Sequence, residues 1–146
     1  MTDTVSKKTR VLFICGHNSG RSQMAEAFLR DVAGDRFQIE SAGLDPRPIN
    51  PLVIDVMAEL GIDLSRQTSD SVFSFFRNGR LYDVVITVCD DTTEAKCPIF
   101  PGITQRHHWP FPDPEALSGP RDARLDALRN IRDDIRTKVI EWADAQ

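Results

Sequence analysis

Hydrophobic and polar positions along the chain follow two different periods, which predict strands and helices in alternation. Short apolar runs at residues 11–14 and 83–88 are typical of strands buried on both faces of a parallel sheet. Residues 37–43 and 103–109 mix polar and apolar positions and predict two further strands. The segments between these strands are long enough to form helices.

Apolar residues recur every three or four positions between the strands, which is the spacing of one helix face. A first helix is predicted over residues 22–32, and Gly34 ends it. A second helix begins with Asn50 as its N-cap and Pro51 in its first turn, and it ends at Gly61. The predicted apolar faces consist of Met24, Ala25, Phe28, Leu29 and Val32 in the first helix and of Val53, Ile54, Met57 and Leu60 in the second.

Two further helices complete the pattern. A short helix over residues 69–77 is expected to bury Val72, Phe73 and Phe76. A long C-terminal helix begins near Arg121, and its charged residues are typical of a solvated face. Its apolar side consists of Leu125, Leu128, Ile131, Ile135, Val139 and Trp142.

Strands that alternate with helices predict an α/β fold, in which helices cover both faces of a parallel sheet. Right-handed crossovers favour a single doubly wound, four-stranded parallel sheet of flavodoxin-like architecture. The length of 146 residues suits one domain. We assign residues 1–9 to a flexible, polar N-terminal lead-in and residues 10–146 to the domain.

Composition and charge argue against several classes of protein. The net charge of −4, with acidic and basic residues interleaved, argues against nucleic acid as the main partner. No apolar run approaches the ~18 residues of a transmembrane helix, so we expect no membrane association. The three cysteines are an odd number without a secretion signal, which predicts reduced thiols and a cytoplasmic location.

The segment between the first strand and the first helix carries the candidate chemistry. Cys15 ends the strand, and the glycine-containing loop and helix N-terminus after it would direct N–H groups at an anion. Arg21 can grip two oxygens of a tetrahedral oxyanion, and the Ser22 hydroxyl can donate to the Cys15 sulfur. A buried structural cysteine beside a surface arginine is the alternative. The predicted oxyanion-binding residues are Gly16, His17, Asn18, Ser19, Gly20 and Arg21.

The sequence CGHNSGRSQMAE, residues 15–26, resembles the Cys-x5-Arg-Ser signature of low-molecular-weight protein tyrosine phosphatases. It resembles more closely the thioredoxin-coupled arsenate reductases that share this fold, and the resemblance covers nearly the whole chain. It implies Cys15 as the nucleophile, assisted by Arg21 and Ser22. The Asp-Pro after the last strand implies Asp113 as the general acid, with a helix N-cap as its alternative role.

The second and third cysteines lie in TVCDDTTEAKCPIFPG, which resembles the redox segment of the same arsenate reductases. The resemblance implies that Cys89 attacks Cys15 and that Cys97 then forms a redox disulfide with Cys89, which thioredoxin reduces. If the segment is helical, the Cα atoms of residues 89 and 97 lie ~12 Å apart, beyond the ~7 Å limit of a disulfide, so it must unwind. Inert cysteines, or a metal site shared with His107 or His108, are the alternatives.

Some arsenate reductases of this type hold a potassium ion near the loop. The resemblance carries that site to four positions with oxygen-bearing side chains, as a hard cation requires. These positions are Asn18, Glu26, Ser41 and Asp70. A hydrogen-bond network that supports the loop without an ion is equally compatible with them, and no tightly bound cofactor is expected.

The resemblance implies that the protein reduces arsenate to arsenite through a relay of three thiols, for arsenic detoxification. Cys15, Cys89 and Cys97 carry the relay, and thioredoxin is the expected partner. One alternative is a phosphatase, in which water resolves the intermediate and Cys89 and Cys97 are dispensable. The other is a non-enzymatic sensor of oxyanions or arsenite, which would not need Asp113.

Overall fold

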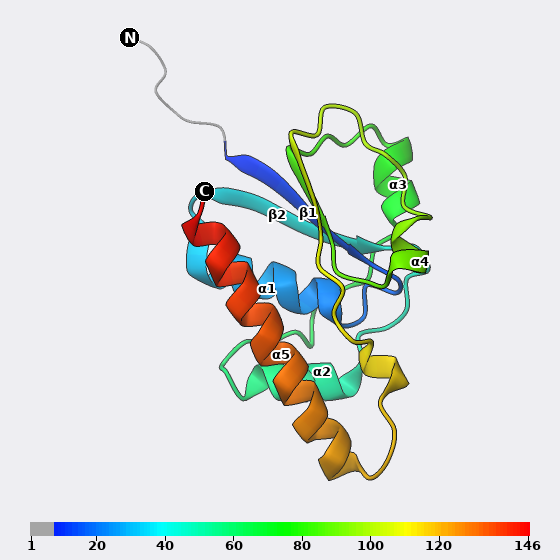
Figure 1. Ribbon diagram of the computed structural model, residues 1–146, viewed down its shortest axis with the longest axis vertical. Coiled ribbons are helices and arrows are strands. Elements are labelled where there is room, and N and C mark those ends of the chain that lie inside the picture. Colours follow the sequence, from blue (N-terminus) through cyan, green and yellow to red (C-terminus); the bar gives the residue numbers. More distant parts are fainter. Residues whose placement is uncertain (1–7) are drawn as a thin grey trace.

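The computed structural model describes residues 8–146, which form one parallel β-sheet covered by helices (Figure 1). The strands lie in the order β2-β1-β3-β4, and neighbouring strands are parallel. Their bounds are Thr9–Cys15 for β1, Phe37–Gly43 for β2, Val84–Thr87 for β3 and Gln105–His108 for β4. The predicted four-stranded parallel sheet is therefore confirmed.

Helices cover both faces of the sheet, as predicted. In Figure 1, α1, α2 and α5 lie together on one side of the sheet and α3 lies on the other. The short helix α4 follows β3, and a 3-10 helix, η1, follows β4. The bounds are Arg21–Ala33 for α1, Pro51–Ala58 for α2, Val72–Arg77 for α3, Asp91–Glu94 for α4, Pro114–Ala116 for η1 and Arg121–Asp144 for α5.

The central strand β1 contributes to two separate cores, because successive side chains of a strand point to opposite faces. Val11 and Phe13 are buried among α1, α2 and α5, in what we call the α1 core. Leu12 and Ile14 are buried beside α3, in what we call the α3 core. Burial on both faces explains the uninterrupted apolar run in this strand. Cys15 belongs to the α1 core.

The predicted start of the third helix, at residue 69, was wrong. Ser71 is extended and forms a β-bridge with Gly43, whose N–H donates to the Asp70 carbonyl at 2.8 Å. The Ser71 side chain accepts from the Ser74 N–H and caps α3, so the helix begins at Val72. The backbone before the cap is held by the end of β2.

The predicted buried face of this helix is confirmed at Val72 and was wrong at Phe73 and Phe76. Val72 and Phe75, three positions apart, are buried in the α3 core. Phe73 and Phe76 are exposed, although the Phe76 ring packs edge-on against Phe100 with centroids 5.4 Å apart. In a helix of 6 residues, moving the buried face by one position along the sequence changes which aromatic ring is covered.

Strand ends differ from the prediction by a few residues. Thr9 pairs with β2, so β1 begins inside the range that we assigned to the lead-in, and residues 1–7 of that range lie outside the described residues. β4 is shorter than the predicted strand over residues 103–109. The Thr104 N–H donates to the Asp83 carbonyl at 2.8 Å before the strand begins.

Two residues assigned to the apolar helix faces are exposed, Val32 and Leu60. The core meets the last turn of α1 on the side of Ala33, which is buried instead. Leu60 lies beyond the end of α2, in the turn before Gly61, where φ is 76°. The remaining residues predicted for these two faces are buried or, at Ile54, partly buried.

The C-terminal helix buries all six residues predicted for its apolar side. These residues pack in the α1 core, largely against α1 and α2. The other positions of α5 are rich in arginine and aspartate. Among the helices of residues 8–146, none is both long and apolar enough to cross a membrane.

We expect Phe75→Ala to lower the free energy of unfolding by about 3–5 kcal/mol, because the ring is only 6% exposed and its removal leaves a cavity. Phe73→Ala, in the same helix but with a residue 37% exposed, should cost less than about 1 kcal/mol. Urea unfolding of both variants, at equal m-values, checks the difference. Equal losses would contradict the observed face of α3.

Candidate active site

The loop after β1 surrounds the Cys15 sulfur. Cys15 is buried, and its Sγ lies 2.8 Å from the Ser22 Oγ. The Asn18 backbone N–H donates to the same sulfur at 3.2 Å. The N-terminus of α1, at Arg21 and Ser22, directs its free N–H groups toward this point. Two hydrogen bonds and the helix end therefore converge on the sulfur.

Asn18 holds the loop in shape. Its φ of 52° is in the left-handed region, which residues other than glycine rarely adopt. Its Nδ2 donates to the Ser22 Oγ at 2.8 Å and to the Ser41 Oγ at 2.9 Å, and its Oδ1 accepts from the Asp70 N–H at 2.9 Å. Because the Ser22 oxygen already accepts from Asn18, the hydroxyl hydrogen of Ser22 can point at Cys15.

The end of β2 and the chain after it support the loop from its other side. A Cβ on Gly43 would lie 2.7 Å from the Asn18 backbone N, so glycine is needed where the loop approaches this closely. N–H groups of the β2–α2 connection donate to loop carbonyls in the pairs Asp45–Gly16, Arg47–His17 and Asn50–Ser19. These carbonyls are thus turned away from Cys15, which leaves the loop N–H groups to bind an anion.

Arg21 and Asp113 face each other at the mouth of the loop. Arg21 is buried, its Nη1 donates to the Phe111 carbonyl at 3.1 Å, and its Nη2 lies 3.9 Å from the Asp113 Oδ1. Asp113 also accepts from the Glu115 N–H at 2.9 Å and caps η1. The N-cap role that we kept as an alternative is therefore present, and the same carboxyl borders the pocket above Cys15.

The narrow space between these groups is about 10 Å³, room for about one water molecule. The lining residues are Cys15, His17, Ser19, Gly20, Arg21, Asp113, Pro114 and Glu115.

All three cysteines are free, and they are divided between the two cores. Cys89 follows β3 and belongs with Cys15 to the α1 core. Cys97 belongs to the α3 core on the opposite face. Between Cys89 and Cys97, the α-helix is limited to α4. The two thiols therefore contact different sets of buried residues.

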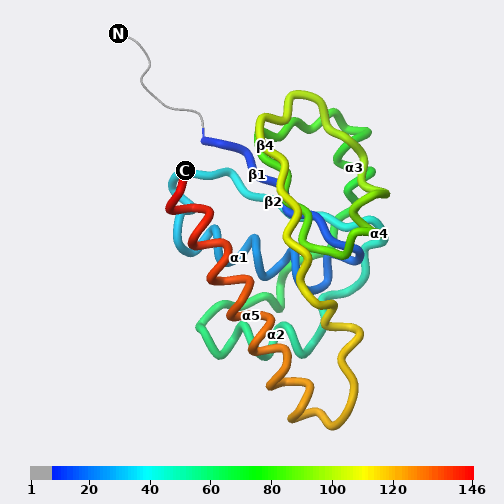
Figure 2. The backbone as a smooth tube through the Cα atoms, viewed as in Figure 1, coloured from blue at the N-terminus to red at the C-terminus, as the bar shows by residue number. Residues whose placement is uncertain are grey.

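Residues 90–97, which we call the redox segment, lie against the anion loop. The Thr93 Cγ2 lies 3.8 Å from the place where a Cβ on Gly16 would be. Figure 2 shows α4 beside the turn that follows β1. The Asp90 carboxylate accepts from the Thr93 N–H at 2.7 Å and caps α4. A movement of the redox segment therefore changes the packing against the loop at Gly16.

Burial controls the protonation of the two downstream thiols. Burial, together with smaller contributions from the neighbouring Cys97 and Cys15, raises the pKa of the Cys89 thiol to about 12. Burial also raises the pKa of the Cys97 thiol to about 11, against the opposing effect of Arg106. Both groups are therefore neutral thiols near neutral pH, and neither competes with Cys15 for an electrophile.

The four residues considered for potassium form a chain of hydrogen bonds. Asn18 donates to Ser41, whose hydroxyl donates to the Glu26 carboxylate. Glu26 also pairs with Arg30 at 2.7 Å. Asp70 meets Asn18 through its backbone N–H. A hollow of about 230 Å³ is lined in part by Glu26, Ser41 and Asp70.

The two histidines of β4 make different contacts, and those of His108 were not predicted from the sequence. His107 packs against Trp142, with ring centroids 6.3 Å apart. His108 bridges Thr87 Oγ1, at 2.6 Å from its Nδ1, and Asp91 Oδ1, at 2.7 Å from its Nε2. The alternation of side chains along a strand is the signal that separates them. Across residues 8–146, no three or more His, Cys, Asp or Glu side chains form a group that could hold a metal ion, so the alternative site with the cysteines is not formed.

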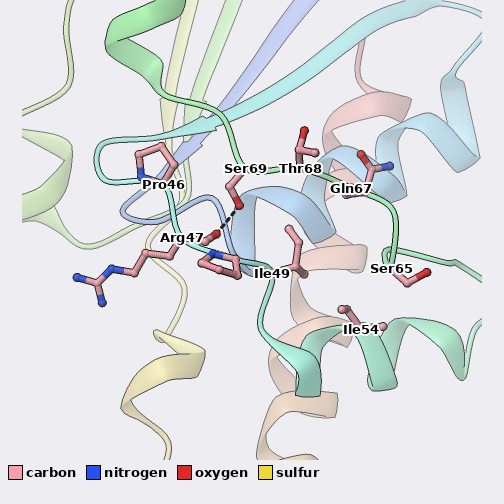
Figure 3. A pocket seen from close by; sticks show the side chains of 9 residues that line it. Pro46, Arg47, Ile49, Ile54, Ser65, Gln67, Thr68 and Ser69 are labelled. Carbon is pink, nitrogen blue, oxygen red and sulfur yellow. Dashed lines mark hydrogen bonds between the residues drawn. The ribbon is translucent and has the colours of Figure 1, made fainter.

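A second, more open hollow of about 490 Å³ lies between the β2–α2 connection, α2 and the chain before α3. Figure 3 shows its lining, in which the Ser69 hydroxyl donates to the Arg47 carbonyl. The lining residues are Pro46, Arg47, Pro48, Ile49, Ile54, Ser65, Gln67, Thr68 and Ser69. None of these is a cysteine, so the chemistry belongs to the smaller space at Cys15.

A nucleophilic cysteine in an anion loop, with an arginine and an acid above it, defines a class of enzyme that attacks tetrahedral oxyanions. Residues 10–146 match the family described as low molecular weight phosphotyrosine protein phosphatase, and the chain belongs to that family. The Wzb protein of Vibrio vulnificus, solved with benzylphosphonate, has the same fold, with a TM-score of 0.76 at 19% identity over 96% of this chain and all of that one.

Within the family, the chain is similar to arsenate reductases. It is 37% identical to the arsenate reductase of Bacillus subtilis, over 92% of this chain and 94% of that protein. A solved arsenate reductase in its phosphate-binding state matches with a TM-score of 0.74 and 34% identity, covering 92% of this chain and 95% of the other. A thioredoxin-dependent arsenate reductase of Corynebacterium glutamicum matches with a TM-score of 0.72 and 30% identity, covering 97% of this chain and 63% of the other.

Cys89 and Cys97 should resist alkylation in the folded, reduced protein. At pH 8 we expect iodoacetamide to modify them at least about a hundredfold more slowly than in the urea-unfolded chain, because their raised pKa values leave little thiolate. Peptide mass spectrometry after timed quenching measures each site. Rates in the folded protein that match those of the unfolded chain would contradict the protonation state given above.

Ser22→Ala should slow attack by Cys15, because it removes a hydrogen-bond donor to the sulfur. We expect kcat for hydrolysis of p-nitrophenyl phosphate to fall about 10- to 100-fold, the usual effect of a hydrogen bond to a charged group. Ser118→Ala, at an exposed serine, is the matched control. An unchanged kcat in Ser22→Ala would show that Ser22 does not assist the sulfur.

Proposed function

We propose that the protein reduces arsenate to arsenite in the cytoplasm, as a step in arsenic detoxification, and that thioredoxin returns it to the reduced state. The observation that carries this proposal is the placement of the cysteines. Cys15 lies in an anion loop, Cys89 shares its core, and Cys97 lies at the far end of the redox segment. The similarity to arsenate reductases over most of the chain supports it.

The first step uses the loop and its acid. Arsenate displaces Arg21 from the Phe111 carbonyl, and the guanidinium and loop N–H groups bind its oxygens. The Cys15 thiolate attacks arsenic, and a sulfur–arsenic bond replaces an arsenic–oxygen bond. Asp113 donates a proton to the departing oxygen, which leaves as water. Arsenic remains pentavalent at this stage.

The second and third steps move oxidation from arsenic to the cysteines. Cys89 loses its proton to an arsenic-bound oxygen and attacks the Cys15 sulfur. The sulfur–arsenic bond breaks, its electron pair stays on arsenic, and arsenite leaves while a Cys15–Cys89 disulfide forms. Cys97 then gives its proton to solvent and attacks the Cys89 sulfur, and Cys15 leaves as a thiolate. The dithiol of thioredoxin reduces the resulting Cys89–Cys97 bond and becomes a disulfide itself.

Hydrolysis of phosphoesters is a second candidate function, favoured by the family match and by the position of Asp113. This reaction follows the same steps as arsenate reduction until the covalent intermediate on Cys15 has formed. Water then attacks the intermediate, so Cys89 and Cys97 have no role in this reaction. The buried, neutral state of both thiols suits the relay, in which each acts only after the step before it.

Potassium is a further part of the proposal, with no tightly bound cofactor besides. Glu26, Ser41 and Asp70 supply oxygens beside one hollow and fit a hard cation by donor type. Asn18 does not fit, because its Oδ1 already accepts from the Asp70 N–H and its Nδ2 faces Ser41. An ion there would share the Glu26 carboxylate with Arg30 and would stabilise the support of the loop.

The relay predicts how Cys97→Ser behaves. With arsenate, thioredoxin and thioredoxin reductase, the unmodified protein should oxidise NADPH over many turnovers. Cys97→Ser should stop after a single turnover, because the Cys15–Cys89 bond has no internal thiol to attack it.

Hydrolysis of p-nitrophenyl phosphate by Cys97→Ser is the control, and it should match that of the unmodified protein. Absence of arsenate-dependent NADPH oxidation in the unmodified protein, beside rapid phosphate ester hydrolysis, would assign the chain to the phosphatases instead.

A further inference from the structure

We propose that His108 is a positioning residue that holds the redox segment in its reduced conformation through Asp91. This inference rests on the proposed function, in which the redox segment must open for Cys97 to reach Cys89. The latch, as we call the His108–Asp91 contact, joins the end of β4 to the first residue of α4.

The imidazole of His108 bridges two elements. Its Nδ1 lies 2.6 Å from the Oγ1 of Thr87, its fully buried register partner on β3. Its Nε2 lies 2.7 Å from the Asp91 Oδ1. A carboxylate accepts only, so Nε2–H donates to Asp91 and Nδ1 accepts the Thr87 hydroxyl when the ring is neutral. In the imidazolium, Nδ1–H donates to Thr87 instead, so the bridge forms in either protonation state.

The same strand holds α4 at a second point. Arg106 and His108 are two positions apart on β4 and so point to the same side of the sheet. The Arg106 Nη2 lies 4.0 Å from the Glu94 Oε1, at the last residue of α4. The two side chains therefore bind opposite ends of the helix. His107, between them, packs with the aromatic rings of the α1 core instead.

These contacts belong to the reduced protein. Cys97 packs in the core that does not include Cys89, and in the relay proposed above the redox segment opens to bring the two sulfurs together. Unwinding separates Asp91 from His108. The latch therefore stabilises the dithiol relative to the disulfide, and it keeps Cys97 away until the Cys15–Cys89 bond has formed.

The contact is weak enough to open in each turnover. The Asp91 side chain is 91% exposed and that of His108 is 27% exposed. Pairs exposed to this degree change an equilibrium by about threefold rather than a hundredfold. The equilibrium affected is thiol–disulfide exchange with thioredoxin. On one side are the Cys89–Cys97 dithiol and oxidised thioredoxin, and on the other are the Cys89–Cys97 disulfide and reduced thioredoxin.

The test is the reduction potential of the Cys89–Cys97 pair in the full chain, measured against thioredoxin. In His108→Asn the shorter amide still reaches Thr87 but not Asp91, and the equilibrium should shift about threefold toward the disulfide, or about 14 mV more negative. Cys97 in the reduced variant should also react with iodoacetamide about threefold faster. His108→Gln, whose Nε2 takes the place of the imidazole Nε2, should restore both values.

Two further variants make the result specific. Asp91→Ala should give the same shift, and the double variant should add nothing to it, because both remove one contact. His107→Asn is the matched control on the other side of β4 and should leave the potential unchanged. A His108→Asn shift no larger than that control, or effects of His108 and Asp91 that add, would overturn the latch. Neither readout requires arsenate. An absence of arsenate turnover would therefore overturn the proposed function, and the effect of the latch could still be measured.

Discussion

The hydrogen bonds of the Asn18 side chain hold a left-handed backbone turn in place, and the candidate active site is built on that turn. The turn brings the Asn18 N–H onto the Cys15 sulfur, and the amide fixes the Ser22 hydroxyl that faces the same sulfur. The supporting groups come from three elements, namely α1, β2 and the chain before α3. The site therefore exists only when the sheet and these neighbours are assembled.

The second organising feature is the division of the cysteines between two cores. Cys15 and Cys89 lie in the α1 core, where the adjacent strands β1 and β3 end side by side. Cys97 lies in the α3 core. Burial keeps Cys89 and Cys97 protonated, which delays the disulfide between them. A thiol relay needs such an order, because a disulfide between Cys89 and Cys97 formed too early would leave Cys15 without a partner.

The sequence predicted the parts of the site that are contiguous. Residues 15–22 form strand end, loop and helix start in one run, and local rules for such runs are strong. Contacts between distant residues were harder to predict. Asp113 caps η1 and also faces Arg21, so its role as a cap leaves the proposed role of general acid open to the same carboxyl. His108 was taken as a strand residue, because its contact with Asp91 depends on where α4 folds.

Local patterns in the chain were enough to predict the alternation of strands and helices, the order of the anion loop, and the long apolar side of α5. These features depend on periodicity and on neighbours within a few positions. The burial of Phe75 rather than Phe73 could not be predicted in this way, since it depends on how a helix of 6 residues docks on the sheet. The same holds for the core in which each cysteine lies and for the groups that meet at Arg21. Those outcomes depend on packing between segments far apart in the sequence, where many arrangements satisfy the same local pattern.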